Sequence, residues 1–237
     1  MNICETTLRK TIPLVINVFN QHTYLKKMID QFLSANFKNI YVIDNNSKYP
    51  ALLDYYSELQ SNDRVKVFYY NANRGPHYFF TSQLYKELFF NFPFLYTDPD
   101  LSFDKISDDF LSNLFKISLK YAVFKVGCAL TLPNDSEINQ ANNVYRKDGN
   151  IFTIKQIEES HWLNLVEPNV YNAPIDTTFH LFNTPLYLQN SPLITGLRIA
   201  GLGMEAKHLP WFKPSLISDN ELSFYKVQEN QFTNWLA

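Results

Sequence analysis

The segment IPLVINVFNQHTYLKKMIDQ, residues 12–31, decides the fold. Its first part, Ile12 to Val18, is β-branched and apolar on both faces, as in a strand buried within a parallel sheet. After the polar residues 20–23, apolar side chains recur at helical spacing through Leu33. A buried strand that leads directly into an amphipathic helix is typical of the first unit of an α/β protein.

The same alternation continues to residue 69. Asn39 to Ile43 is a second strand, Leu52 to Leu59 is helical, and Val65 to Tyr69 is a third strand. This βαβαβ order predicts a parallel, doubly wound sheet flanked by helices. Because the crossovers are right-handed, the carboxyl ends of the strands lie at one edge, where such sheets bind ligands.

Further elements are expected up to residue 130: a helix at Phe79–Phe90, a strand at Phe94–Thr97, a helix at Ser107–Leu119 and a strand at Ala122–Leu130. The rest of the chain is less regular, with scattered strands such as Thr178 to Phe182. No linker separates the two parts, so we predict one domain over residues 1–237, with halves at about 1–130 and 131–237.

Composition and charge limit the kinds of function. Hydrophobic residues make up 46% of the 237 residues, so a large core can be buried. Lys and Arg number 21 against 23 Asp and Glu, a balance with no general attraction for nucleic acid. No apolar run approaches the roughly 20 residues of a membrane span. Cys4 and Cys128 are the only cysteines and no signal peptide is visible, so reduced thiols in the cytoplasm are expected.

Polar clusters end three of the predicted strands: Asn17-Val18-Phe19-Asn20, Asp44-Asn45-Asn46-Ser47 and Asp98-Pro99-Asp100. In a parallel sheet these clusters converge in space although they are far apart in the sequence. Neither the Gly-rich dinucleotide fingerprint nor the P-loop is present. If a nucleotide binds at this edge, a divalent cation held by a carboxylate is the obvious means of neutralising its phosphates.

The carboxylates of Asp98 and Asp100 suit that task, because one can take ribose hydroxyls and the other the metal. The alternative is a turn in which Asp100 or Ser102 caps the next helix. Asp44 follows the second strand, where a carboxylate accepts hydrogen bonds from a ribose or a base. For Asp44 the alternative is an Asx-turn that ends the strand.

Five further side chains are candidates for contacts with a nucleotide sugar, namely Asn17, Asn20, Asn73, Arg74 and Arg198. The loop at residues 73–75 brings backbone and a guanidinium near the predicted edge, although it is equally consistent with a solvated loop. Arg198 is a single guanidinium that would reach a phosphate. His22, His77, His161 and His180 show no metal-ligand spacing and are assigned no chemistry.

Taken together, the motifs resemble the inverting family 2 glycosyltransferases of the GT-A fold, in particular those that make bacterial surface polysaccharide or lipopolysaccharide. The resemblance runs from about Ile12 to Trp211 and includes, in order, IPLVINVFNQHTYLKKMIDQ, YVIDNNSKYPALLDYY, NANRGPHYFF, FLYTDPDL, NAPIDTTFHLF and RIAGLGMEAKHLPWF. It implies a Rossmann-type, mostly parallel sheet with a less regular, acceptor-binding C-terminal half.

The resemblance also implies roles for individual residues. Asp44 would contact uracil or ribose, Asp98 would be the nucleotide-side member of the DxD motif, and Asp100 would hold the Mn²⁺ or Mg²⁺. Asp176 falls at the position of the catalytic carboxylate, although Ile175 stands where the family usually has a second acid. His208 is the candidate for a C-terminal ligand to the metal or the diphosphate.

Two of these roles have structural alternatives. Asp176 is also a good N-cap residue, and His208 would equally be a half-buried imidazole with satisfied hydrogen bonds. Trp211 is a candidate to stack on a sugar, or to anchor the core.

The predicted function is therefore a metal-dependent, inverting glycosyltransferase. It would move a sugar from a nucleoside diphosphate, expected to be UDP, to a hydroxyl of a carbohydrate or glycolipid, in the cytoplasm or at the inner face of a membrane. One alternative is a sugar nucleotidyltransferase, which needs a Gly-rich, basic loop after the first strand, where the chain has Phe19-Asn20-Gln21-His22. The other is a non-catalytic nucleotide-sugar-binding module, which keeps Asp44 and Asp98 but does not need Asp176.

Overall fold

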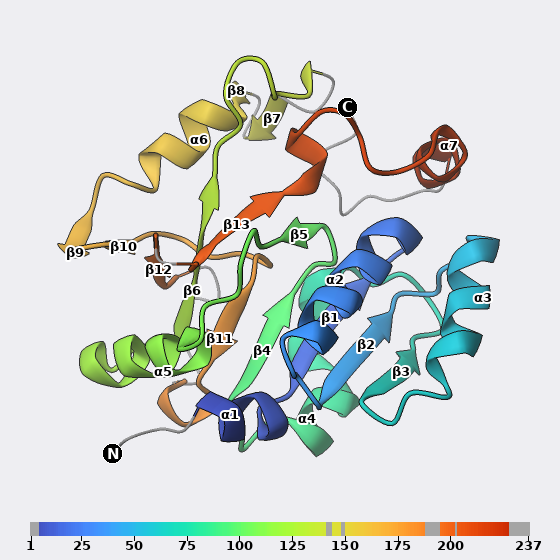
Figure 1. Ribbon diagram of the computed structural model, residues 1–237, viewed down its shortest axis with the longest axis horizontal. Coiled ribbons are helices and arrows are strands. Elements are labelled where there is room, and N and C mark those ends of the chain that lie inside the picture. Colours follow the sequence, from blue (N-terminus) through green and yellow to red (C-terminus); the bar gives the residue numbers. More distant parts are fainter. Residues whose placement is uncertain (1–4, 141–143, 148–149, 188–194, 202, 228–237) are drawn as a thin grey trace.

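A central sheet with helices packed on both faces forms the fold (Figure 1). The computed structural model describes residues 5–140, 144–147, 150–187, 195–201 and 203–227. The strand order along the sheet is β3-β2-β1-β4-β11-β6-β12-β10-β9. The α/β class predicted from the sequence is confirmed.

The N-terminal half follows the predicted alternation closely. Its elements are β1 (Leu14–Val18), α2 (His22–Ser34), β2 (Ile40–Asp44), α3 (Pro50–Leu59), β3 (Val65–Tyr69) and β4 (Phe94–Thr97). Strand β1 pairs in parallel with both β2 and β4, and β2 pairs in parallel with β3. The strands therefore share a direction, and the polar clusters that follow β1, β2 and β4 lie at the same edge.

The helix predicted over Phe79–Phe90 is wrong in its extent. The chain instead forms a 3₁₀ helix, η1 (Pro76–Thr81), and a short α-helix, α4 (Gln83–Leu88). Ser82 separates them in an extended conformation, and its hydroxyl accepts a hydrogen bond from the backbone N–H of Tyr85. A serine that caps the second helix breaks a pattern that apolar spacing alone reads as continuous.

The sheet continues beyond β4 through strands from later in the chain: β6 (Lys125–Thr131), β11 (His180–Phe182) and β12 (Leu197–Ile199). Strand β11 is antiparallel to both β4 and β6, and β12 is parallel to β6. Accordingly β6 and β12 run in the same direction as β4. Helix α5 (Phe110–Tyr121) precedes β6 and ends at Ala122, whose φ of 51° is left-handed, so the strand begins later than predicted.

Two short strands attach the C-terminal part to the edge that follows β4. Strand β5 (Leu101–Ser102) pairs with β13 (Glu205–His208), which also pairs in parallel with β6. The register of this ladder places His208 opposite Leu101. The sequence pattern does not reveal this pairing. The pairing places His208 next to Leu101, the residue that follows Asp100.

Other elements were not expected from the sequence: α1 (Glu5–Thr11), β7 (Val144–Lys147), β8 (Asn150–Thr153), α6 (Ile154–Ser160), β9 (Leu165–Glu167), β10 (Val170–Asn172), the 3₁₀ helices η3 (Thr184–Leu186) and η4 (Leu209–Trp211), and α7 (Asp219–Val227). Within the described part of the chain, no helix is long and apolar enough to span a bilayer. Association with a membrane surface stays a prediction.

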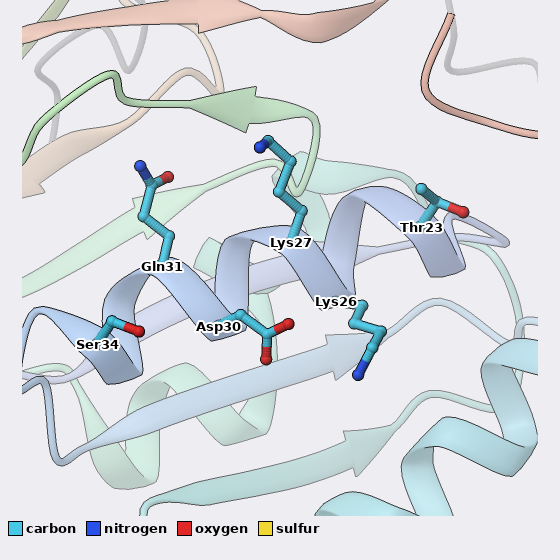
Figure 2. Close-up of a pocket in the computed structure, with 6 residues that line it drawn as sticks. All are labelled: Thr23, Lys26, Lys27, Asp30, Gln31 and Ser34. Atoms are coloured by element: carbon cyan, nitrogen blue, oxygen red, sulfur yellow. The ribbon is translucent and has the colours of Figure 1, made fainter.

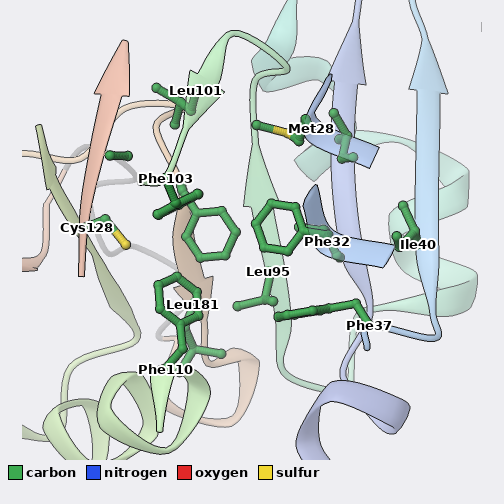
Figure 3. Packing of buried hydrophobic residues seen from close by; sticks show 14 of the residues in the cluster. Met28, Phe32, Phe37, Ile40, Leu95, Leu101, Phe103, Phe110, Cys128 and Leu181 are labelled. Carbon is green, nitrogen blue, oxygen red and sulfur yellow. The ribbon is translucent and has the colours of Figure 1, made fainter. Parts of the chain in front are cut away.

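Apolar side chains form a cluster on each face of the sheet. Phe32, Phe103 and Phe110 lie in the larger cluster, where their rings meet between α2 and α5 (Figure 3). The smaller cluster is dominated by aromatic residues from η1, α4 and β4. Cys128 is buried with a free thiol, and Cys4 lies outside the described residues.

Candidate functional site

The polar clusters predicted to converge do so at the edge of β1, β2 and β4. Val18 lies beside Asp44 in the β1–β2 ladder, and Ile16 lies beside Thr97 in the β1–β4 ladder. Asp44 and Asp98 therefore follow strands separated only by β1, which puts their backbones about 10 Å apart at the usual spacing of strands. This convergence follows from parallel pairing.

Asparagine side chains join the loops at this edge. The Asn45 amide donates to Oδ1 of Asn17 at 2.6 Å, which links β2 to β1. Oδ1 of Asn20 accepts from the backbone N–H groups of Lys48 at 2.6 Å and Tyr49 at 3.0 Å, just before α3. Asn17 and Asn20 thus support the loop geometry. A direct contact of either with a ligand stays a prediction.

The carboxylate of Asp44 is buried and held by two hydrogen bonds. The hydroxyl of Tyr56 donates to Oδ1 at 2.8 Å, and the backbone N–H of Ser47 donates to Oδ2 at 2.9 Å. The bond from Ser47, three residues further on, closes a local turn at the end of β2, as in the structural role considered as the alternative. Because each carboxylate oxygen accepts more than one hydrogen bond, the turn and a contact with a ribose or base are compatible.

The loop of Asn73 and Arg74 lies beside this cluster. Oδ1 of Asn73 accepts from the backbone N–H of Gly75, and the backbone N–H of Arg74 reaches Oδ1 of Asn45 at 3.5 Å. The guanidinium of Arg74 lies over the ring of Tyr78, 5.0 Å from its centre. The structure therefore places the loop at the predicted edge, with a cation stacked on an aromatic ring.

Asp100 and His208 form a buried pair. Nε2 of His208 lies 3.3 Å from Oδ2 of Asp100, and the carbonyl of Asp100 accepts from the backbone N–H of Leu209 at 2.8 Å. Both residues are 5% exposed. Oδ1 of Asp100 is buried and has no hydrogen-bond partner among the described residues. A carboxylate oxygen with unused lone pairs is a ligand that suits Mn²⁺ or Mg²⁺, and the imidazole adds a nitrogen donor beside it.

Asp98 is joined to the segment that carries Asp176. Its backbone N–H donates to the carbonyl of Thr177 at 3.1 Å, and the Thr177 hydroxyl donates to its carboxylate. Burial and the charge of Asp100 raise the pKa of Asp98 well above its usual value, although the Thr177 hydroxyl opposes this. Asp98 and the segment that carries Asp176 therefore belong to one hydrogen-bonded unit.

The backbone around Asp176 is held by side chains from two strands. Nζ of Lys125, on β6, donates to the carbonyls of Ile175 at 2.7 Å and Asp176 at 2.9 Å. The guanidinium of Arg198, on β12, donates twice to the carbonyl of Pro174. Four consecutive carbonyls, from residue 174 to 177, thus accept hydrogen bonds, which fixes the loop. Asp176 does not start a helix, because the next element is β11.

Arg198 is not placed as a contact with phosphate would require. It is 5% exposed, and besides Pro174 its guanidinium contacts Oε2 of Glu158 at 2.9 Å. Through these contacts, Arg198 holds the backbone of the loop that carries Asp176. A contact with phosphate stays a prediction that the observed partners of Arg198 do not support.

Trp211 is 3% exposed and its ring lies 4.8 Å from that of His208, which favours its role as a core anchor.

The sequence pattern gave no indication of some residues at the site. His77 contacts the Asp176 carboxylate, with Nε2 2.8 Å from Oδ1. Lys125 and Tyr56 hold Asp176 and Asp44 through the hydrogen bonds described above. His77 and Lys125 lie far along the chain from Asp176, and Tyr56 comes 12 residues after Asp44, so no local spacing signals these contacts. The pairing of β11 with β4 and β6 brings the segment of Asp176 close to Lys125.

Two cavities lie away from these aspartates. One, of about 490 Å³, is open and follows the outer face of α2, where it is lined by Thr23, Lys26, Lys27, Asp30, Gln31 and Ser34 (Figure 2). The other, of about 310 Å³, is lined by Thr131, Leu132, Glu159, Trp162 and Glu205. Neither is lined by the polar clusters at the edge, so cavity volume does not locate the candidate site.

Comparisons with solved structures identify proteins of the same fold. A mannosyltransferase from Pyrobaculum calidifontis, in complex with GDP-Man and Mn²⁺, is 13% identical with a TM-score of 0.51, and the match covers 94% of this chain and 62% of that chain. GalNAc-T7 with UDP, GalNAc and Mn²⁺ is 12% identical with a TM-score of 0.54, and the match covers 94% of this chain and 49% of that one.

The chain thus spans about half to three fifths of the length of these two proteins. No family model matches the sequence, and no curated protein matches it. At these identities the likeness establishes architecture and not activity. The chain has the GT-A fold that the resemblance in its sequence implies.

Proposed function

We propose that the protein is a metal-dependent glycosyltransferase that moves a sugar from a nucleoside diphosphate to a carbohydrate hydroxyl. The observation that carries this proposal is the grouping at one sheet edge of Asp44, of Asp98 with Asp100, and of the fixed loop of Asp176, with His208 beside Asp100. The two structural neighbours are complexes with a nucleotide or nucleotide sugar and Mn²⁺, which supports this proposal.

Each carboxylate has a separate task in the proposed site. Asp44 accepts hydrogen bonds from the base or the ribose, and Asp98 binds the nucleotide from the end of β4, on the other side of β1. Asp100 and His208 would hold a divalent cation, Mn²⁺ or Mg²⁺. Among the described residues no group of three or more His, Cys, Asp or Glu side chains is arranged as a metal site, so diphosphate and water oxygens would complete the coordination. When bound, the cation supplies positive charge against the diphosphate leaving group.

The reaction itself is a single displacement. The acceptor hydroxyl oxygen attacks the anomeric carbon, and the bond from that carbon to the phosphate oxygen breaks. The carboxylate of Asp176 takes the proton of the hydroxyl, and the nucleoside diphosphate leaves with the bonding electron pair. Attack from the face opposite the leaving group inverts the anomeric configuration. One base suits this reaction, whereas retaining glycoside hydrolases use a close carboxylate pair of which one is a nucleophile.

Finer features belong to the same proposal. We assign the chain to the family 2 type, with UDP as the carrier, on the motifs described above. We treat residues 1–237 as one domain, with the acceptor bound by the half from about residue 131. A role in surface glycan synthesis, in the cytoplasm or at the inner face of a membrane, agrees with the sequence resemblance.

The first prediction concerns binding of nucleotide and metal. At a UDP or GDP concentration 100 times its Kd with Mn²⁺, the wild-type protein should gain about 2.7 kcal/mol of stability. In a protein of this size that gain raises the Tm by about 5–11 °C. Asp100→Asn should lose the part that depends on Mn²⁺, because an amide oxygen carries no charge for the cation. Differential scanning fluorimetry with and without Mn²⁺ measures both effects.

Asp104→Asn is the matched control, because Asp104 is an exposed carboxylate on the same segment whose partner is Lys207. Its response to nucleotide and Mn²⁺ should equal that of the wild type. If no nucleoside diphosphate stabilises the wild-type protein with Mn²⁺ or Mg²⁺, the proposed function fails.

A further inference from the structure

His77 makes a contact with Asp176 that no pattern in the sequence indicates. Nε2 of His77 lies 2.8 Å from Oδ1 of Asp176, and the two side chains are 44% and 57% exposed. The pair therefore lies at the open edge of the sheet, where an acceptor would approach. Because Oδ1 is engaged by the imidazole, Oδ2 is the oxygen that remains for the proton of an acceptor hydroxyl.

The backbone that carries His77 is fixed independently of Asp176. The hydroxyl of Tyr96, from the buried strand β4, donates to the carbonyl of Pro76 at 2.6 Å. Gly75 has a φ of 76°, in the left-handed region, and its N–H donates to Oδ1 of Asn73. The chain thus turns sharply into η1 at a position set by β4, and His77 follows directly.

The backbone of Asp176 is fixed from the other side, since the carbonyls from residue 174 to 177 accept hydrogen bonds from Arg198, Lys125 and Asp98. With both main chains held, the hydrogen bond between the side chains leaves the carboxylate little freedom to turn. A single exposed ion pair contributes little to stability, so the contact is better explained by orientation than by folding.

We propose that His77 is a positioning residue that orients the carboxylate of Asp176 for proton transfer. This inference rests on the proposed function, in which Asp176 is the base. The imidazole does not contact the reacting atoms. It holds one carboxylate oxygen so that the other faces the acceptor, and it keeps the carboxylate ionised.

The electrostatics of the pair agree with this role. Burial raises the pKa of Asp176, but the hydrogen bond and charge of His77, with the charge of Lys125, outweigh burial, so the pKa lies below its usual value. The other ionisable groups that face Asp176 are Asp98 and Tyr96, both from β4. The carboxylate is only partly buried, but without His77 this partial burial is opposed mainly by the charge of Lys125, so the pKa of Asp176 should rise.

The test compares His77→Ala and His77→Gln with the wild type by sugar transfer across a range of pH. His77→Ala should lower kcat about tenfold, the lower end of the range for a hydrogen bond to a charged group. The acid limb of its pH profile should move to higher pH, because Asp176 then takes up a proton more readily. Glutamine donates a neutral hydrogen bond, so His77→Gln should recover part of kcat but not the acid limb. Stabilisation by UDP or GDP with Mn²⁺ should match the wild type in both variants.

His22→Ala is the control, since His22 lies on α2, where its ring contacts Tyr55. Its pH profile should not move. A second readout does not depend on transfer, namely titration of the Asp176 carboxylate by ¹³C NMR in wild type and His77→Ala. An unchanged titration of Asp176, or an unchanged acid limb, overturns the inference. If the wild type transfers no sugar although Asp176 titrates higher in His77→Ala, the pairing stands and the proposed function is what fails.

Discussion

The Asp176→Asn variant is expected to lose sugar transfer by about 100- to 10,000-fold, the usual contribution of a positioned general base. The amide has nearly the same shape as the carboxylate, and its oxygen can still accept from His77. It cannot take a proton from the acceptor hydroxyl. The loop should keep its conformation, because Lys125 and Arg198 hold backbone carbonyls and not the carboxylate. The measurement is release of nucleoside diphosphate from UDP- and GDP-hexoses with mono- and disaccharide acceptors.

Binding must be measured on the same variant. Stabilisation by nucleoside diphosphate and Mn²⁺ should be retained, since Asp44, Asp98 and Asp100 are unchanged. Asp54→Asn, an exposed aspartate on α3, controls for loss of an acid elsewhere. Transfer at the wild-type rate would remove Asp176 as the base. Such transfer would also exclude the non-catalytic binding module. It would then indicate that a different residue acts as the base.

The binding module and the nucleotidyltransferase are separated from the proposed function by different residues. A binding module needs Asp44 and Asp98 but gives no reason for four hydrogen-bonded carbonyls around Asp176. A nucleotidyltransferase needs a basic, glycine-rich loop after β1 to meet a triphosphate. In the structure that loop contains Asn20, whose side chain is committed to the backbone before α3. The proposed glycosyltransferase function is consistent with both the fixed loop of Asp176 and the loop after β1.

Much of the nucleotide half was predictable because its determinants are local. Strands β1 to β4 are short, apolar runs that end in polar clusters, and parallel pairing then places those clusters together. The sequence pattern alone therefore predicts that Asp44 and the pair of Asp98 and Asp100 lie at one edge of the sheet. The helix boundary at Ser82 was missed, because a capping serine inside an aromatic run leaves the apolar spacing intact.

The environment of Asp176 could not be predicted in the same way. Its partners come from η1, β4, β6 and β12, and the short strand β11 enters the sheet antiparallel between β4 and β6. Strands of three residues carry too little pattern to fix such a pairing. The family resemblance alone predicts His208 as a metal ligand. The pairing of β5 with β13 is what explains why its side chain lies beside Asp100. Long-range pairing decides both positions.

Arg198 provides the largest expected effect on stability. Arg198 and Glu158 are each 5% exposed, and Nη1 of the arginine lies 2.9 Å from Oε2 of the glutamate. Removal of one partner of a buried ion pair typically costs about 3–5 kcal/mol. In this variant His161 would remain beside the buried carboxylate of Glu158, without the guanidinium. We therefore expect Arg198→Met, which keeps most of the side-chain volume, to lower the Tm by about 6–20 °C at neutral pH.

The Tm difference between Arg198→Met and the wild type should depend on pH because of Glu158. Burial raises its pKa, but the hydrogen bonds and charges of His161 and Arg198 outweigh burial and bring it below the usual 4.5. A depressed pKa contributes stability that is present above the unfolded-state value and is lost as pH falls through the folded-state value. In Arg198→Met the glutamate should accept a proton at higher pH, which relieves the buried charge. The Tm difference from wild type should therefore narrow as the pH is lowered toward 4.5.

Lys120→Met is the matched control, because the ion pair of Lys120 with Glu167 lies at the surface, with side chains that are 49% and 25% exposed. Exposed pairs are screened by water and salt, so this variant should keep the wild-type Tm. Thermal unfolding of both variants and the wild type at neutral and acid pH measures the two effects. Equal Tm values for Arg198→Met and Lys120→Met would mean that the buried guanidinium does not hold the loop at Pro174. Because that loop carries Asp176, the arginine would then have to be reconsidered as a group available to phosphate.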